Sequence, residues 1–118
     1  MIEKVIYDYL NNCFADSALG ISAYMERPVN PPESYVLIEK IGSGGEENHI
    51  KKSTLAIQSI KPSLYEAAVL NESVKDFMRA AISLDKIAKV ECNSDYNFTD
   101  SSTKTYRYQA VFDIKYYL

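Results

Sequence analysis

The stretch from Ser34 to Ile60, SYVLIEKIGSGGEENHIKKSTLAIQSI, decides the fold, because it contains two strand-like runs around a glycine-rich, acidic segment. The first run, 34–41, is rich in β-branched and aromatic residues, and in the second, 54–58, apolar and polar residues alternate. We therefore predict an antiparallel hairpin whose first strand is central in its sheet. The tip of this hairpin is predicted to consist of Gly42, Ser43, Gly44, Gly45, Glu46, Glu47 and Asn48.

The glycines of this tip raise the question of a phosphate-binding loop. Such a loop requires a following helix whose N-terminus meets the anion, and here a strand follows. Glu46 and Glu47 are adjacent carboxylates on a flexible tip, which is poor preorganisation for catalysis. His49, the single histidine, has no nucleophile beside it in the sequence. The tip is therefore interpreted as a partner-binding segment, and a small hydrolase or nucleotide-binding enzyme using residues 42–49 is the alternative.

Hydrophobic periodicity predicts the remaining elements. They are a helix from 2 to about 15–20, a short strand over 21–26, a helix from 63 to about 82 with an interruption at 71–73, a strand over 87–92, a long turn over 93–103 and a strand over 106–116. The second helix starts at Ser63-Leu-Tyr-Glu66, which matches a capping box. In the last strand the predicted buried face carries Tyr106, Tyr108, Ala110, Phe112, Ile114 and Tyr116.

This element order predicts one α+β domain over residues 1–118. We expect the order α-β-β-β-α-β-β, with an antiparallel or mixed sheet of four to five strands and both helices packed on one face. Val111 and Tyr117 lie on the opposite face of the last strand, which indicates that this second face also packs against something. Tyr117 is therefore added to the hairpin tip as a candidate interface residue.

Composition excludes several classes of function. The chain has 118 residues and a formal charge of −3, so it lacks the net basic surface of a nucleic-acid-binding protein. All apolar runs are far shorter than the roughly 20 residues of a membrane-spanning helix, and the N-terminus does not resemble a signal peptide. Cys13 and Cys92 are predicted to be buried free thiols, because they lie in apolar-periodic segments without CxxC spacing. No cofactor or metal site is predicted.

The chain resembles a known group of proteins over nearly its whole length. The likeness is carried by Tyr24-Met-Glu-Arg-Pro28, Ser34-Tyr-Val-Leu-Ile-Glu39, the Gly42-Ser-Gly-Gly45 segment, Ala56-Ile-Gln-Ser59 and Tyr106-Arg-Tyr-Gln-Ala-Val-Phe-Asp113, in this order. Together they resemble the small tail-completion proteins encoded in the head–tail joining modules of long-tailed bacteriophages and prophages, in particular the tail terminators.

This resemblance implies a structural protein without an active site. Such a protomer would assemble as a ring, a hexamer, on the end of the tail tube, where it stops tube polymerisation and offers a surface to the head connector. DNA would pass through the lumen without specific recognition. The protein would reside in the bacterial host cytoplasm during assembly and then in the virion. Two alternatives remain: a neck or head-closure connector protein of the same module, and a monomeric module that binds a peptide at an open sheet edge.

Overall fold

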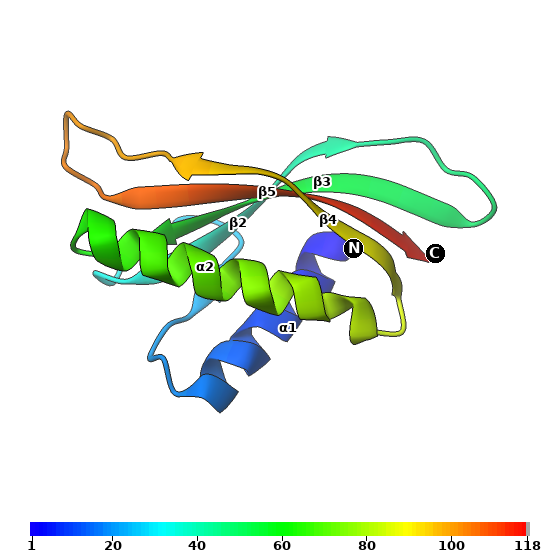
Figure 1. Ribbon diagram of the computed structural model, residues 1–118, viewed down its shortest axis with the longest axis horizontal. Coiled ribbons are helices and arrows are strands. Elements are labelled where there is room, and N and C mark those ends of the chain that lie inside the picture. Colours follow the sequence, from blue (N-terminus) through cyan, green and yellow to red (C-terminus); the bar gives the residue numbers. More distant parts are fainter. Residues whose placement is uncertain (118) are drawn as a thin grey trace.

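The computed structural model describes residues 1–117, which form one α+β fold with an open sheet (Figure 1). The elements are α1 (Ile2–Ser17), β1 (Ala23–Tyr24), β2 (Tyr35–Ser43), β3 (Ile50–Ile60), α2 (Leu64–Ala80), the 3-10 helix η1 (Ala81–Ser83), β4 (Ile87–Asn97) and β5 (Arg107–Tyr117). The predicted fold class and the order α-β-β-β-α-β-β are confirmed.

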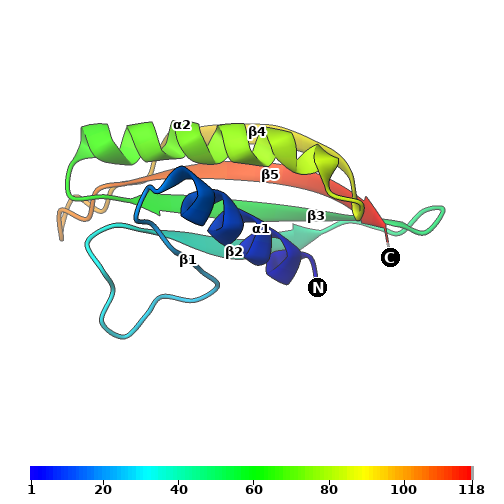
Figure 2. The same ribbon diagram turned by 90° about the horizontal axis from the view of Figure 1, so that it is seen from below.

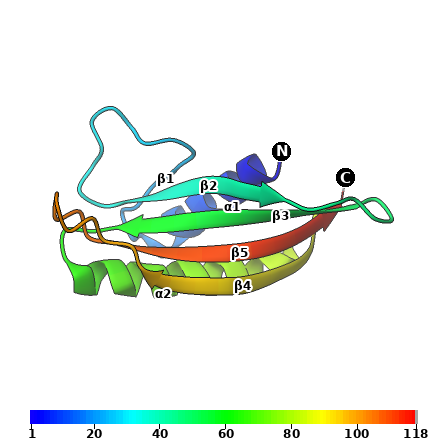
Figure 3. The same ribbon diagram turned by 90° about the horizontal axis from the view of Figure 1, so that it is seen from above.

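The strands of the sheet follow the order β1-β2-β3-β5-β4. The sheet is mixed, because β1 runs parallel to β2 and all other neighbours are antiparallel. Both helices cover the same face, with α2 over β4 and β5 and α1 over β2, as Figures 2 and 3 show from opposite sides. The first hairpin strand, predicted to be central, is an interior strand between β1 and β3, while the middle position of the sheet belongs to β3.

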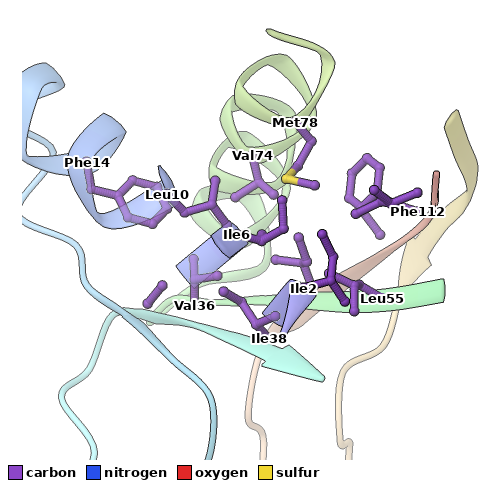
Figure 4. Close-up of a cluster of buried hydrophobic side chains, with 14 of the residues drawn as sticks. Ile2, Ile6, Leu10, Phe14, Val36, Ile38, Leu55, Val74, Met78 and Phe112 are labelled. Atoms are coloured by element: carbon purple, nitrogen blue, oxygen red, sulfur yellow. The ribbon is translucent and has the colours of Figure 1, made fainter. Parts of the chain in front are cut away.

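The core lies between the helices and the covered face of the sheet (Figure 4). β3 contributes Leu55 and Ile57, whose partners on β5 are Phe112 and Ala110, and all four are buried. The buried residues of α1 are Ile2, Ile6, Leu10 and Phe14. Burial of each large apolar side chain contributes roughly 1.5–3 kcal/mol, so this layer dominates the stability of the fold.

The start of α2 confirms the predicted capping box. The side-chain oxygen of Ser63 accepts a hydrogen bond from the backbone N–H of Glu66 at 3.2 Å, and its hydroxyl donates to the Glu66 carboxylate at 3.0 Å. The predicted interruption at 71–73 is wrong, because α2 continues unbroken to Ala80. Asn71 is buried instead, and its amide donates to the Asp95 carboxylate on β4 at 3.3 Å.

β4 is longer than predicted and runs to Asn97, so the turn that follows is 98–106 and not 93–103. The extension pairs with β5 through polar residues that periodicity does not mark as a strand. Cys92, predicted to be buried, is exposed on this edge strand, while Cys13 is half-buried, and both thiols are free. A register shift between Cys92 and Ser94 kinks the strand.

A side-chain amide closes the other edge of the sheet. The Asn11 amide on α1 donates to the carbonyl of Ala23 at 3.3 Å and accepts from the N–H of Ala23 at 2.7 Å. It therefore occupies the place that another strand would take beside β1. A buried backbone group left without a partner costs about 1–3 kcal/mol, so this one side chain holds a strand of two residues in the sheet.

The Asn11→Ala substitution is expected to lower the free energy of unfolding by about 1–3 kcal/mol, because the buried N–H of Ala23 loses its partner. Urea denaturation followed by circular dichroism measures this loss. Asn12→Ala is the matched control, since the neighbouring Asn12 is exposed on the same helix, and it should change stability by less than about 0.5 kcal/mol. Equal losses in the two variants would contradict the role of Asn11.

Tyr9 connects the two helices, because its hydroxyl donates to the carbonyl of Phe77 on α2 at 2.6 Å. The pKa of Tyr9 is raised from 10.0 to about 12. Burial is the main cause, and the neighbouring Cys13 thiol adds to it. Folding therefore favours the neutral phenol. The contribution of this group to stability is complete below pH 10 and is lost as the pH rises toward 12.

We expect the stability difference between the wild-type protein and Tyr9→Phe to be about 1 kcal/mol at pH 7 and to shrink as the pH rises above 10. The difference isolates Tyr9 from the other tyrosines and the lysines, which titrate in the same range in both proteins. Urea denaturation at pH 7, 9 and 11 measures it. A difference that stays constant or grows over this range would contradict the assignment.

Candidate assembly surface

The β2–β3 hairpin projects from one end of the sheet, beyond the other strands (Figure 3). Two of the predicted tip residues belong to the ladder itself, because Gly42 pairs with Thr54 and Ser43 with Ser53. The ladder continues one step further, where the N–H of Gly44 donates to the carbonyl of Lys52 at 2.7 Å. The glycine segment is thus more ordered than the sequence suggested.

The chain reverses at Asn48-His49 and not at the glycines. Glu47 and Ile50 exchange two backbone hydrogen bonds, of 3.0 and 2.9 Å, around these two residues. Asn48 and His49 both have positive φ, 52° and 64°, which is the conformation of a type I′ hairpin turn. His49, the candidate base of the enzyme alternative, therefore occupies an exposed turn position.

Gly44 is required by a close approach between the two strands. A Cβ atom at this position would lie 3.1 Å from the Cβ of Lys52, whereas a Cβ at Gly45 would meet nothing within 4 Å. The first atom belongs to the root of the lysine side chain, which cannot move without its backbone.

Gly44→Val is expected to open the distal hairpin and to expose the Gly44 amide, while global stability falls by only about 1 kcal/mol because the segment is exposed. Hydrogen exchange measured residue by residue should show protection lost over residues 44–52 and kept in β5. Gly45→Val is the control and should keep the protection of both segments. Loss of protection in both variants would show that any side chain disturbs this loop.

The two glutamates of the tip are exposed and unpaired. Within residues 1–117, neither Glu46 nor Glu47 takes part in an ion pair. Glu47 and three lysines, Lys51, Lys52 and Lys115, line a hollow of about 310 Å³ at the base of the tip. These lysines lie near the tip, but within residues 1–117 none of them forms an ion pair with Glu46 or Glu47. The two carboxylates are therefore available to a partner.

Tyr117 lies beside this tip, as the candidate interface requires. It pairs with Ile50, the residue that closes the turn with Glu47, and its N–H donates to the carbonyl of Lys86 at 2.9 Å. Its side chain is 49% exposed. The structure therefore brings Tyr117 together with the tip, although they are more than sixty residues apart in the sequence.

The sheet face opposite the helices carries two aromatic residues that the sequence reasoning did not select. Tyr96 pairs with Gln109, and Phe98 follows at the end of the same edge; they are 41% and 39% exposed. Their rings meet edge to face at 5.9 Å, and the Arg107 guanidinium lies 4.8 Å from the centre of the Phe98 ring. Tyr96 and Phe98 are two residues apart, which is typical of one face of a strand. The polar residues around them led instead to the prediction of a turn over 93–103.

Polar side chains connect the central strands across this open face. Gln58 on β3 donates to Gln109 on β5 at 3.2 Å. Hydrogen bonds from Asn93, which has the larger effect, and from Thr54 lower the pKa of Asp113 below its ordinary value. These contacts hold the polar side chains of this face in fixed positions, which suits a docking surface.

Within the described residues, 1–117, no group of three or more His, Cys, Asp or Glu side chains is arranged to hold a metal ion. No helix in this range is long and apolar enough to span a bilayer. A comparison with models of known protein families finds no matching family, and a comparison with curated proteins finds no match.

Proposed function

We propose that this protein is a structural component of a phage or prophage virion that caps the end of the tail tube as a hexameric ring. In this role it ends tube polymerisation and presents a surface to the head connector. The proposal assigns it no catalytic activity and no cofactor. It starts from the resemblance of the ordered segments to tail terminators and requires a protomer with surfaces left free for neighbours.

The observation that carries the proposal is the combination of an open sheet face with a hairpin projecting from its end. Both helices pack on one face, so no helix or sheet of residues 1–117 covers the other, and this second face exposes the aromatic rings of Tyr96, Phe98 and Tyr117. Aromatic residues are enriched at protein interfaces, because they bury a large apolar surface, and tyrosine also keeps a polar tip. A face of this kind fits contacts between subunits or with a tube.

A peptide-binding module is the second candidate, and the free edge of β4 favours it. Asn11 blocks the β1 edge, but no strand of residues 1–117 pairs with the outer side of β4. An extended peptide could add there as a further strand. The register shifts in β4 weigh against this candidate, since bulges commonly protect an edge from pairing.

Native mass spectrometry of the purified protein over a range of concentrations tests the proposal. A six-subunit species that grows with concentration is expected. A protomer that stays monomeric at every concentration, and that binds neither tube ends nor connector, would contradict it and favour the peptide-binding module. A pull-down against tube protein and connector protein separately distinguishes a tail terminator from a neck protein.

A further inference from the structure

A small pocket with two arginines lies at the end of the sheet opposite the hairpin tip. Its volume is about 160 Å³, and its lining includes Arg27, Tyr35, Leu37, Gln58, Asp100 and Arg107. We call it the arginine pocket. Figure 1 shows the β4–β5 turn, which contributes to it, at one end of the molecule and the β2–β3 tip at the other. The molecule measures 44 Å along its longest axis.

Both guanidinium groups of the pocket lack a carboxylate partner within residues 1–117. Arg107 is held in place, because its Nε donates to the carbonyl of Phe98 at 2.7 Å and its head lies over the Phe98 ring. Arg27 is exposed on the loop before β2. Asp100 adds one negative charge to the lining, and its Oδ1 accepts the N–H and O–H of Ser102 at 3.1 and 2.6 Å, which ties this carboxylate to the turn.

The pocket lining combines Tyr35 and Leu37 with a polar side chain that is held in place, Gln58. Gln58 is only 7% exposed and is fixed by its hydrogen bond to Gln109. A neighbouring hollow of about 280 Å³ shares Arg27 and adds Lys61, Lys104 and Glu33. Across the two hollows, four basic side chains (Arg27, Arg107, Lys61 and Lys104) stand against two acidic ones (Asp100 and Glu33). A fixed guanidinium, a second one on a loop and further lysines form a surface that suits carboxylates, because the guanidinium fork matches the two carboxylate oxygens.

The chain itself carries a partner of this chemistry. Glu46 and Glu47 are exposed at the projecting tip, have no ion pair within residues 1–117 and lie at the opposite end of the molecule. We propose that the acidic tip of one copy docks into the arginine pocket of the next copy. This inference rests on the ring of the proposed function and names the contact that joins its subunits.

Such a contact is heterologous, since it joins two different surfaces of the same chain. Contacts of this type close into a ring when the rotation between copies allows it. A tip and a pocket at opposite ends of one protomer leave both surfaces of each copy free for its two neighbours. Charge complementarity also fixes the direction in which the copies follow one another.

Charge reversal in two separate variants tests the contact. Arg27→Glu reverses the pocket, and Arg27 makes no hydrogen bond or ion pair within residues 1–117, so folding should be unaffected. Glu46→Lys combined with Glu47→Lys reverses the tip. Each variant alone should raise the apparent dissociation constant of the ring about tenfold or more, as close charge pairs at interfaces do. Arg79→Glu, a reversal of an exposed arginine on α2, is the control and should assemble like the wild type.

Mixing the two variants gives the decisive result. In the mixture, the basic tip of the Glu46→Lys/Glu47→Lys variant can bind the acidic pocket of Arg27→Glu. The acidic tip of Arg27→Glu can bind the basic pocket of the other variant. Copies that alternate around the ring should therefore restore assembly. Only rings with an even number of subunits can close in this way, and native mass spectrometry should find equal numbers of the two variants in each ring. Circular dichroism of each variant confirms that it is folded.

The possible failures are distinguishable. If the wild type forms rings and Arg27→Glu forms them equally well, the arginine pocket does not bind the tip and this inference is overturned, while the proposed function stands. If the variants lose assembly but the mixture does not recover it, the direct contact is likewise excluded. If the wild-type protein is monomeric at all concentrations, the ring and the contact fall together.

Discussion

Replacing Phe112 by alanine is expected to lower the free energy of unfolding by about 3–5 kcal/mol, the largest loss that one side chain of this protein should produce. Phe112 is 2% exposed on β5, between Leu55 on β3 and Cys92 on β4. It lies in the layer that α2 covers, close to Met78 in Figure 4. Alanine would leave a cavity that the paired strands cannot close, because their backbone hydrogen bonds fix their spacing.

Urea denaturation monitored by circular dichroism measures this loss. Tyr117→Ala is the control, since it removes an aromatic ring from the same strand on the exposed face. At a concentration where the protein is monomeric, the control should cost less than about 1 kcal/mol. Losses of similar size in Phe112→Ala and Tyr117→Ala would mean that the two faces of the sheet are equally covered, which contradicts the open face.

Shortening the hairpin tip should abolish assembly and leave the protomer folded. Replacement of residues 45–51 by Asn-Gly joins Gly44 to Lys52, a pair that is already hydrogen-bonded at 2.7 Å, through a turn of the preferred type. The new hairpin keeps β2, β3 from Lys52 onward and the core, and it loses only the first two residues of β3, Ile50 and Lys51, with their pairing to β5. The apparent dissociation constant of the ring should rise at least about 100-fold, since the loss of an interface anchor costs 2 kcal/mol or more.

Sedimentation velocity over a concentration series measures this change. The control is His49→Gly, which keeps the length and the acidic residues of the tip and suits the positive φ of 64° at this position. It should assemble like the wild type. A shortened protein that still forms rings at wild-type concentrations would show that the tip is not part of the interface.

The element order and the hairpin could be predicted from the sequence, because their signals are local. Alternation in β3 and β5, the capping box at Ser63 and the helical period of α1 all act within a few residues. The same periodicity predicted that both helices pack on one face of the sheet. Each of these segments prefers by itself the structure that the whole fold gives it.

The errors arose where distant residues decide the local structure. The end of β4 is polar, so only its pairing with β5 shows that it is a strand. Asn71 looked like a helix-breaking residue, yet a hydrogen bond to Asp95 on β4 keeps it inside α2. The end of α1 shows the same dependence, because Phe14 is buried there against the ring of Phe77 on α2, with the two ring centres 5.8 Å apart.

The candidate site was predicted in part. The projecting hairpin and the place of Tyr117 beside it follow from simple strand pairing. The tip was predicted over residues 42–48, whereas the turn itself is formed by Asn48 and His49 at the end of that segment, and residues 42–44 pair with β3. The arginine pocket could not be foreseen, because Arg27 and Arg107 are eighty residues apart and meet only through the loops at the far end of the sheet.

Electron microscopy of tail tubes incubated with this protein tests the central claim most directly. Under the proposed function, the tubes would be polymerised from the tail tube protein of the phage or prophage that would encode this chain. We predict a ring of six copies on the tube end and shorter tubes when the protein is present during polymerisation. Bare tube ends and an unchanged distribution of tube lengths, at concentrations where the protein is folded, would contradict the account.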